Sequence, residues 1–240
     1  MLNIMGRSAA LAFLLCLASA PARAAAEVVA GVIIVIKGAP NVKSAGSGFV
    51  KPLKRNQFVN EGDQIITKAG EYASIAFIGG AEVRISENSA FVVESGGGQK
   101  PTRLFTALGK AWTRMLQGHG HAGISIRTPS AVAAVRGTEA DVESNERMTV
   151  KVYEGFVDVF NDQGKQALKA GEMTQVANAQ SAPEAPKTMS ESDKQSWQDD
   201  LKADGVEKQI GRLQKEADRR RSLELKTKDG KTIKINLEKK

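Results

Sequence analysis

Residues Met148–Phe160, MTVKVYEGFVDVF, decide the fold class of this chain. Apolar and polar side chains alternate on both sides of Glu154-Gly155, and alternation with a period of two is typical of half-buried strands. A two-residue loop at Glu154-Gly155 would set Val152 opposite Val157 and gather the valines of both strands on one face. This stretch therefore predicts a β-hairpin with one apolar face.

A second hairpin is predicted where Glu71–Phe77 and Ala81–Ile85 flank two glycines. A three-residue loop would set Ala73 opposite Ile85, whereas a two-residue loop would bring the other face into register, and we favour the three-residue loop. Further strands are predicted at Val28–Ile36, Gln64–Thr67, Phe91–Glu94, Ile124–Thr128, Val132–Val135, Glu139–Glu143 and Glu172–Val176.

Turn signals recur about every ten residues, which is the spacing of a sandwich, barrel or β-roll. The predicted fold is all-β, a sandwich or β-roll of many short antiparallel strands, followed by a helical tail and a C-terminal β-hairpin. Arg103–Leu116 leaves two possibilities open. Its large apolar residues fall at helical spacing, but Gly109 in the middle disfavours a helix.

The composition is that of a soluble globular protein. Of the 240 residues, 41% are hydrophobic, 25% charged and 5% aromatic, which excludes a collagen-like chain, wholesale disorder and a polytopic membrane protein. The first residues differ, because Arg7 precedes an apolar run, Ser8–Ala20, that is followed by small residues suited to cleavage. We expect an export signal at residues 1–24, and a periplasmic or secreted chain with no stable membrane insertion after its removal. Cys16 lies in this signal, so we expect the mature chain to have no disulfides or thiolate metal sites.

Charge and proline content divide the remainder. Ala25–Pro186 has 17 basic and 16 acidic residues, whereas Lys187–Lys240 has 15 basic and 11 acidic residues. Asn178–Ser190 contains two prolines among small polar residues, which is typical of a linker. The expected units are a β domain at 25–177, a linker at 178–190, an amphipathic helical segment at 191–221 and a β-hairpin at 222–240.

The tail carries its own signals. Ser190 with Asp193 is a weak capping box and predicts the start of a helical segment. Near the C-terminus, a three-residue loop at Lys228–Gly230 would set Leu225 opposite Ile233. The tail could dock on the β domain, on a partner or on an anionic surface. Its mixed acidic residues favour docking on the chain itself or exposure to solvent, and export disfavours nucleic acid.

The order of these motifs resembles the FecR domain family, named for the ferric-citrate regulator of bacterial envelopes, over about Val28–Val176. The matching stretches are Gly31-Val32, Gly38, Gly62–Thr67 (GDQIIT), Ala73–Phe77, Gly79–Ile85 (GGAEVRI), Arg127–Ala131 (RTPSA), Val135–Glu139 (VRGTE), Val150–Val157 and Ala170–Glu172 (AGE). The resemblance implies an all-β domain outside the cytoplasm and favours strands around Gly109. It also implies, for the regulators of this family, a signal received from an outer-membrane transporter and passed to a cytoplasmic domain that controls a sigma factor. We expect this chain to have neither that cytoplasmic domain nor a spanning segment.

Ten residues form the family signature in this chain, and their chemistry favours a structural role. Thr128-Pro129 fixes a backbone angle, glycine permits positive φ, and an acid after glycine accepts turn amides. The signature residues are Gly62, Asp63, Thr67, Thr128, Pro129, Gly137, Thr138, Gly155, Gly171 and Glu172.

Catalytic chemistry is poorly supported. His119 and His121 could share a metal ion, but no third or fourth ligand is marked out nearby, so we predict no metal, no cofactor and no catalytic residue. The favoured hypothesis is an exported, non-enzymatic binding module in envelope signalling or scaffolding, with an envelope protein or polymer as its partner. The alternatives are a metal-dependent envelope enzyme using the histidine loop, a module that binds peptidoglycan or polysaccharide, and a regulator whose cytoplasmic half is a separate chain.

Overall fold

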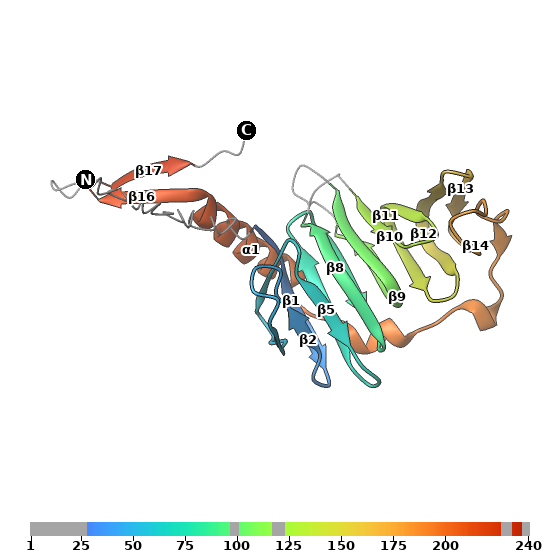
Figure 1. Cartoon of the computed structure of the whole chain (residues 1–240), viewed down its shortest axis with the longest axis horizontal. Coiled ribbons are helices and arrows are strands. Elements are labelled where there is room, and N and C mark those ends of the chain that lie inside the picture. The colour runs from blue at the N-terminus through green and yellow to red at the C-terminus, as the bar shows by residue number, and fades with distance from the viewer. Residues whose placement is uncertain (1–27, 97–100, 117–122, 227–231, 237–240) are drawn as a thin grey trace, which may run out of the picture.

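The computed structural model describes residues 28–96, 101–116, 123–226 and 232–236. The expected export signal and the loop with His119 and His121 lie outside these residues. Within them the chain is mostly strand, with one α-helix near the C-terminus, so the all-β prediction is confirmed (Figure 1). No helix among these residues is both long and apolar enough to cross a membrane.

Fifteen strands form one continuous hydrogen-bonded sheet. The strands of its first half are β1 (Val29–Lys37), β2 (Asn41–Lys43), β3 (Val50–Pro52), β4 (Phe58–Asn60), β5 (Gln64–Thr67), β6 (Tyr72–Phe77), β7 (Ala81–Ile85) and β8 (Ser89–Ser95). Those of its second half are β9 (Thr102–Met115), β10 (Ile124–Arg127), β11 (Val132–Ser144), β12 (Met148–Asn161), β13 (Gly164–Lys169), β14 (Glu172–Val176) and β15 (Lys187–Thr188).

The sheet folds back on itself into two layers, because three long strands take part in both. The front layer runs β3-β2-β5-β8-β9-β10-β11-β12-β13, and the back layer runs β4-β1-β6-β7-β9-β11-β12-β14-β15. The N-terminal half of β9 pairs with β8 and β10, and its C-terminal half pairs with β7 and β11. The main hydrophobic core joins inward side chains of both layers, such as Ile65, Phe91, Ile75 and Val83.

Glycines lie where the long strands pass from one layer to the other. Gly109 in β9 has a φ of 144°, and an added Cβ there would lie 2.6 Å from the Cβ of Ser89. Gly155 in β12 has a φ of 73°. Both angles favour glycine, so these residues allow one strand to serve two layers.

The hairpin predicted at Met148–Phe160 is wrong. This stretch lies within a single strand, β12, which pairs along its length with β11, so that Val150 is opposite Val142 and Val157 is opposite Val135. In a regular strand, residues on the same face are an even number of positions apart. Val152 and Val157 are five positions apart and both are buried, so one extra residue must be accommodated between them. A strand irregularity at Gly155 accommodates the extra residue as well as a turn would. Strand β11 is long enough to pair with β12 both before and after Gly155, so the chain continues as one strand.

Two other predictions of pairing and one of element type are confirmed. Ala73 lies opposite Ile85, as the three-residue loop required. The stretch Arg103–Leu116 forms a strand rather than a helix, because all of it but Leu116 lies in β9. In the C-terminal hairpin of β16 (Ser222–Lys226) and β17 (Thr232–Asn236), Leu225 lies opposite Ile233. The turn predicted at Lys228–Gly230 lies outside the described residues.

The tail crosses the molecule and returns to its first strands. After β15, which lies within the expected linker, come two short 3-10 helices, η1 (Glu191–Asp193) and η2 (Trp197–Leu201), and then α1 (Val206–Arg221). In Figure 1 this orange and red segment runs from the β14 end to the β1 end, and the hairpin β16–β17 extends away from the sheets. The helix α1 contacts β1 and β6, where a second apolar cluster joins the two.

Candidate functional site

The signature residues form separate turns rather than one site. Asp63 accepts the backbone N–H of Asn60 at 2.9 Å and of Ala45 at 3.0 Å, and Glu172 accepts that of Lys169 at 3.0 Å. The glycine before each acid has positive φ, 86° for Gly62 and 85° for Gly171. Gly62-Asp63 and Gly171-Glu172 thus make the same turn, in which the acid accepts the backbone N–H of the residue three positions before it.

The threonines of the signature also make local bonds. The Thr67 hydroxyl donates to the carbonyl of Ser86 at 2.7 Å, and the Thr128 hydroxyl accepts the N–H groups of Ser130 and Ala131, both at 3.2 Å. Pro129 lies within this second turn, and Gly137 and Thr138 lie where β11 shifts register against β12. These contacts fit the structural role that was predicted, and they bring no reactive groups together.

A different set of residues forms the most elaborate polar arrangement in the part of the chain described. Residues 190–204, which we call the strap, lie over the outward face of the back layer. On this face Ser74, Arg84, Trp112, Asp141 and Lys151 stand directly opposite one another on five adjacent strands. Their neighbours along each strand point into the core. We call the outward side chains beneath the strap the strap face: Tyr72, Ser74, Glu82, Arg84, Lys110, Trp112, Arg114, Asp141, Lys151 and Tyr153.

Buried charges hold one part of the strap face together. The Glu82 carboxylate is fully buried and binds the guanidinium groups of Arg84 at 2.7 Å and Arg114 at 2.6 Å, and it accepts the Ser74 hydroxyl at 3.2 Å. The Arg84 guanidinium lies 4.2 Å from the ring centroid of Trp112. Two cations around one buried carboxylate leave a net positive charge at this point of the face, and the charge-assisted bonds fix its side chains.

Asp141 forms a second buried group with cations and a phenol. The Tyr153 hydroxyl donates to Asp141 at 2.8 Å, and the Lys110 ammonium lies 3.7 Å from the same carboxylate oxygen. Burial raises the pKa of Asp141 above its ordinary value, although Lys110 and Tyr153 act in the opposite direction. Burial, followed by the nearby Asp141 carboxylate, also raises the pKa of the Tyr153 hydroxyl.

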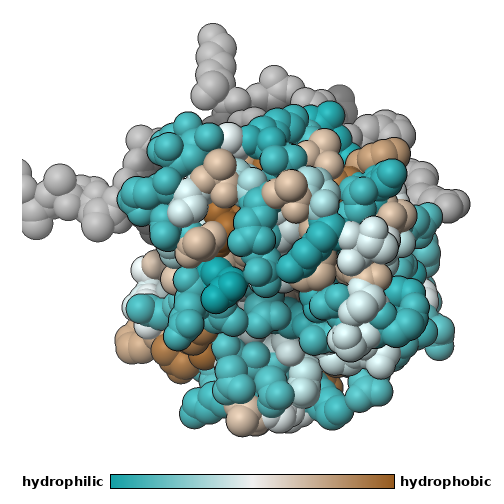
Figure 2. Space-filling model, turned by 90° about the vertical axis from the view of Figure 1, so that its right-hand side faces the viewer, coloured by the Kyte–Doolittle hydropathy of each residue, from teal (hydrophilic) through white to brown (hydrophobic). Residues whose placement is uncertain are grey.

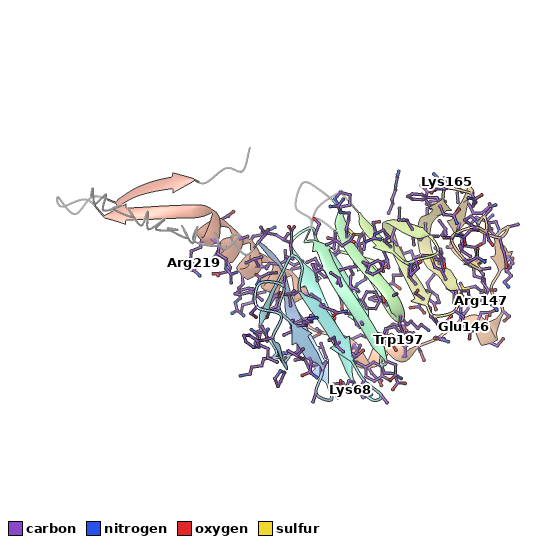
Figure 3. The ribbon with its side chains drawn as sticks, in the orientation of Figure 1. Lys68, Glu146, Arg147, Lys165, Trp197 and Arg219 are labelled. Carbon is purple, nitrogen blue, oxygen red and sulfur yellow. The ribbon has the colours of Figure 1, made fainter. Side chains whose placement is uncertain are left out.

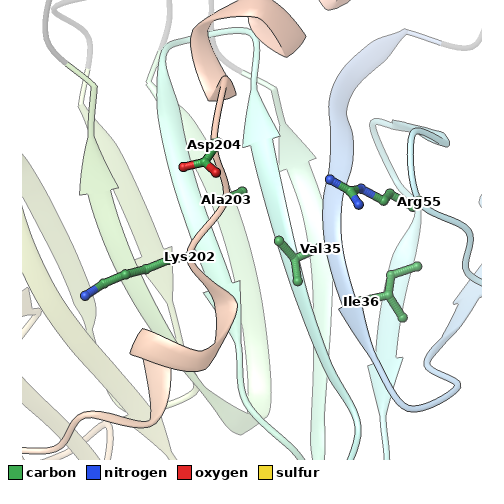
Figure 4. Close-up of a pocket in the computed structure, with 6 residues that line it drawn as sticks. All are labelled: Val35, Ile36, Arg55, Lys202, Ala203 and Asp204. Atoms are coloured by element: carbon green, nitrogen blue, oxygen red, sulfur yellow. The ribbon is translucent and has the colours of Figure 1, made fainter.

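The strap contacts this face through its backbone and one aromatic side chain. Arg84 donates to the carbonyl of Gln198 at 2.8 Å, and Lys151 donates to that of Asp193 at 2.6 Å. Trp197, labelled in Figure 3, stacks on Tyr72 with their ring centroids 6.3 Å apart. At its end, the strap lines a pocket of about 320 Å³ with β1, formed by Val35, Ile36, Arg55, Lys202, Ala203 and Asp204 (Figure 4).

Sequence reasoning did not find the strap face. His119 and His121, which belong to the alternative of a metal-dependent enzyme, lie outside the described residues. Within the described residues no group of three or more metal-ligating side chains occurs. One signal could have been used, because the chain has only two Trp and two Tyr, and all four lie on the strap or the strap face. Their separation in the sequence, at positions 72, 112, 153 and 197, concealed that they meet.

A comparison with models of protein families gives one match within the β layers. Residues 63–158 match the sequence model of the FecR protein family. This matched part of the chain is similar to a FecR domain. The match begins at Asp63 and ends in β12, so it covers parts of both layers and the whole strap face, but not the strap. The comparison with curated proteins found no match.

Solved structures give a partial likeness. Two crystal structures of a Parabacteroides distasonis protein, at 1.65 Å and 2.50 Å, are assigned provisionally as an anti-sigma factor. Each shares 20% sequence identity with this chain at a TM-score of 0.45. The alignment covers 52% of this chain and 59% of the other, so this chain spans little more than half the length of that protein.

Proposed function

We propose that the chain is an exported, non-enzymatic binding module that acts through its FecR domain in envelope signalling or scaffolding. Its partner is a protein or polymer of the envelope, and its place is the periplasm or the outside of the cell. The export signal expected at residues 1–24 and the FecR match support this assignment. Nucleic acid and stable insertion into a membrane are not part of the proposal.

An exposed aromatic pair on β12 is the observation that carries the binding function. Phe156 and Phe160 are 67% and 38% exposed, whereas Val157 and Val159 between them are buried. Both phenylalanines therefore point outward from the front layer. Aromatic side chains are enriched at protein interfaces relative to the rest of the protein surface.

Basic residues surround this pair. Arg136 and Lys169 stand opposite Phe156 on the two neighbouring strands, and Lys165 stands opposite Phe160. The Asp158 carboxylate lies between the phenylalanines, 3.0 Å from the Lys165 ammonium. Figure 2 looks onto the end formed by β13 and β14, where the surface is largely hydrophilic with small hydrophobic spots. The three cations outnumber the two acids that they pair with, Asp158 and Glu172, so the surroundings of the phenylalanines favour a partner that carries acidic groups.

Photocrosslinking in cells tests the proposed function. A photoreactive phenylalanine analogue replaces Phe156 or Phe160 in the full chain, and Phe49, which is 75% exposed on the loop between β2 and β3, is the matched control position. We expect the same envelope protein or polymer to be caught from positions 156 and 160 and not from position 49. Identical products from all three positions, or adducts with cytoplasmic proteins alone, would contradict the proposal.

A further inference from the structure

We propose that the strap face is a binding site for a polypeptide segment, and that the strap occupies it until a partner displaces the strap. This inference rests on the proposed function, since it assumes that the module binds a protein. It adds a second surface, on the layer opposite Phe156 and Phe160, and a means of exposing that surface.

The residue types of the strap face are those of strong binding sites. Trp, Tyr and Arg dominate the energetics of protein interfaces. The face has Trp112, Tyr72 and Tyr153 together with Arg84 and Arg114, and the strap adds the second Trp of the chain. Within the described residues, the main hydrophobic core consists largely of valine, isoleucine and alanine and contains no Trp or Tyr. The Trp and Tyr side chains therefore serve this contact rather than the core.

The strap is recognised through groups that any polypeptide has. Arg84 and Lys151 both donate to main-chain carbonyls of the strap, those of Gln198 and Asp193. A partner segment of different sequence could accept the same bonds, because they do not depend on the strap side chains.

The contact is incompletely satisfied. Among the described residues, five buried side-chain atoms have no hydrogen-bond partner, and all five belong to the strap or the strap face. They are Trp112 Nε1, Arg114 Nε, Asp141 Oδ1, Trp197 Nε1 and Gln198 Oε1. An unpaired buried polar group weakens a contact, because it has lost its hydrogen bonds to water without replacing them. The strap is therefore held less tightly than its aromatic and charged contacts suggest, and a partner that pairs these atoms would bind better.

The strap can leave while the rest of the tail stays. Leu201 is the single fully buried side chain among residues 190–204, all of which are described. The following helix is anchored separately, because Val206, Ile210 and Leu213 pack on β1 and β6 in their own apolar cluster. Segments with few buried apolar contacts open at lower free energy than well-packed ones.

The strap also indicates which segment would replace it. Trp197 stacks on Tyr72 and lies 5.8 Å from the Lys110 ammonium, and Asp200, three residues later, pairs with Lys37 at 3.1 Å. The segment that fits is a peptide with an aromatic residue and a carboxylate three positions on.

A peptide-binding experiment in the full chain tests this proposal. The probe is a fluorescein-labelled synthetic peptide with the sequence of residues 190–204, and its anisotropy is measured against three proteins. These are the natural chain, a strap-weakened variant with Trp197→Ala and Asp200→Ala, and the control Glu191→Ala, whose side chain is 89% exposed and bonds only within the strap. We expect the strap-weakened variant to bind the peptide at least tenfold more tightly than the natural chain and the control. Adding Arg84→Gln to the strap-weakened variant is expected to abolish that gain.

Hydrogen exchange of the same variants completes the test. We expect residues 190–204 to lose protection in the strap-weakened variant while α1 keeps it. A strap that stays protected, or a released strap with no gain in peptide binding, would overturn the proposal. Either failure would leave crosslinking from positions 156 and 160 unaffected, so it would not be confused with failure of the proposed function.

Discussion

Asp141 is buried beneath the strap, and this burial raises the pKa of its carboxyl group above the ordinary 3.8. A pKa that is higher in the folded than in the unfolded state means that the protonated, neutral form of Asp141 stabilises the folded state relative to the charged form. The stability due to this group is therefore full below about pH 3.8 and is lost as the pH rises through the folded-state value. Asp141→Asn keeps an acceptor for Tyr153 without a charge. We expect its free energy of unfolding, relative to the natural chain, to increase from pH 4 upward and then level off.

Urea denaturation at several pH values between 4 and 8 checks this prediction. Each unit of pKa elevation corresponds to about 1.4 kcal/mol at the upper plateau. The matched variant is Glu143→Gln, which removes a more exposed carboxylate that also faces Lys110, at 3.9 Å. An Asp141→Asn difference that is flat or falls with pH would show that the buried charge is fully compensated.

Gly109 gives a second prediction at the residue scale. Its φ of 144° strains any other residue, and a Cβ would clash with Ser89 at 2.6 Å. Gly171 has a φ of 85° with no atom within 4 Å of an added Cβ, so it tests the strain alone. We expect Gly171→Ala to lower the free energy of unfolding by about 1 kcal/mol and Gly109→Ala by about 3 kcal/mol. Equal losses in thermal and urea denaturation would contradict the role of Gly109 in the layer crossing.

At the scale of elements, α1 is held by its apolar stripe. Ile210 is fully buried between this helix and the back layer, whereas Lys208 on the same helix is exposed. Ile210→Ala removes a buried side chain, a change that costs about 2–5 kcal/mol. We expect hydrogen exchange in residues 206–221 to increase sharply, with β6 and β9 still protected, and Lys208→Ala to behave as the natural chain. If the exchange of the strands rises equally, the helix is part of one cooperative unit with them.

Local pattern predicted the short strands and failed where a long strand offered the same alternation as a hairpin. The pairing of Ala73 with Ile85 follows from loop parity, because only one loop length places both on the core side. Either a turn or an irregularity within β12 at Gly155 would place the valines on both sides of it on the core face. Only the length of β11, which pairs with all of this stretch, decides for the irregularity. The family resemblance was needed to predict a strand at Arg103–Leu116. Its large apolar residues happen to have helical spacing, because the strand changes layer at Gly109.

The strap face could not be predicted, for a reason that belongs to topology. Its central row joins residues of β6, β7, β9, β11 and β12, which come from segments far apart in the sequence. Each strand shows alternation, but alternation does not say which strands become neighbours. Buried charged residues such as Glu82 and Arg84 also look like ordinary solvent-facing positions until the tail is placed over them.

At the scale of the whole molecule, the two-layered β domain has two outward faces with different exposure. The front layer leaves Phe156 and Phe160 open to solvent, and the back layer is crossed by the strap and α1. A partner bound at the open face would need no rearrangement, whereas one bound at the strap face must displace residues 190–204. The two faces would thus allow constitutive attachment on one side and conditional recognition on the other, which suits a module in signalling or scaffolding.

Crosslinking from beneath the strap tests this account most directly. A photoreactive phenylalanine analogue replaces Trp112, which is buried in the strap face, and irradiation is carried out in cells with either the natural strap or the Trp197→Ala and Asp200→Ala strap. We expect adducts within the chain, to residues 190–204, when the strap is natural, and adducts to a second envelope polypeptide when it is weakened. Products confined to the chain itself in both cases would contradict the claim that this face receives a partner.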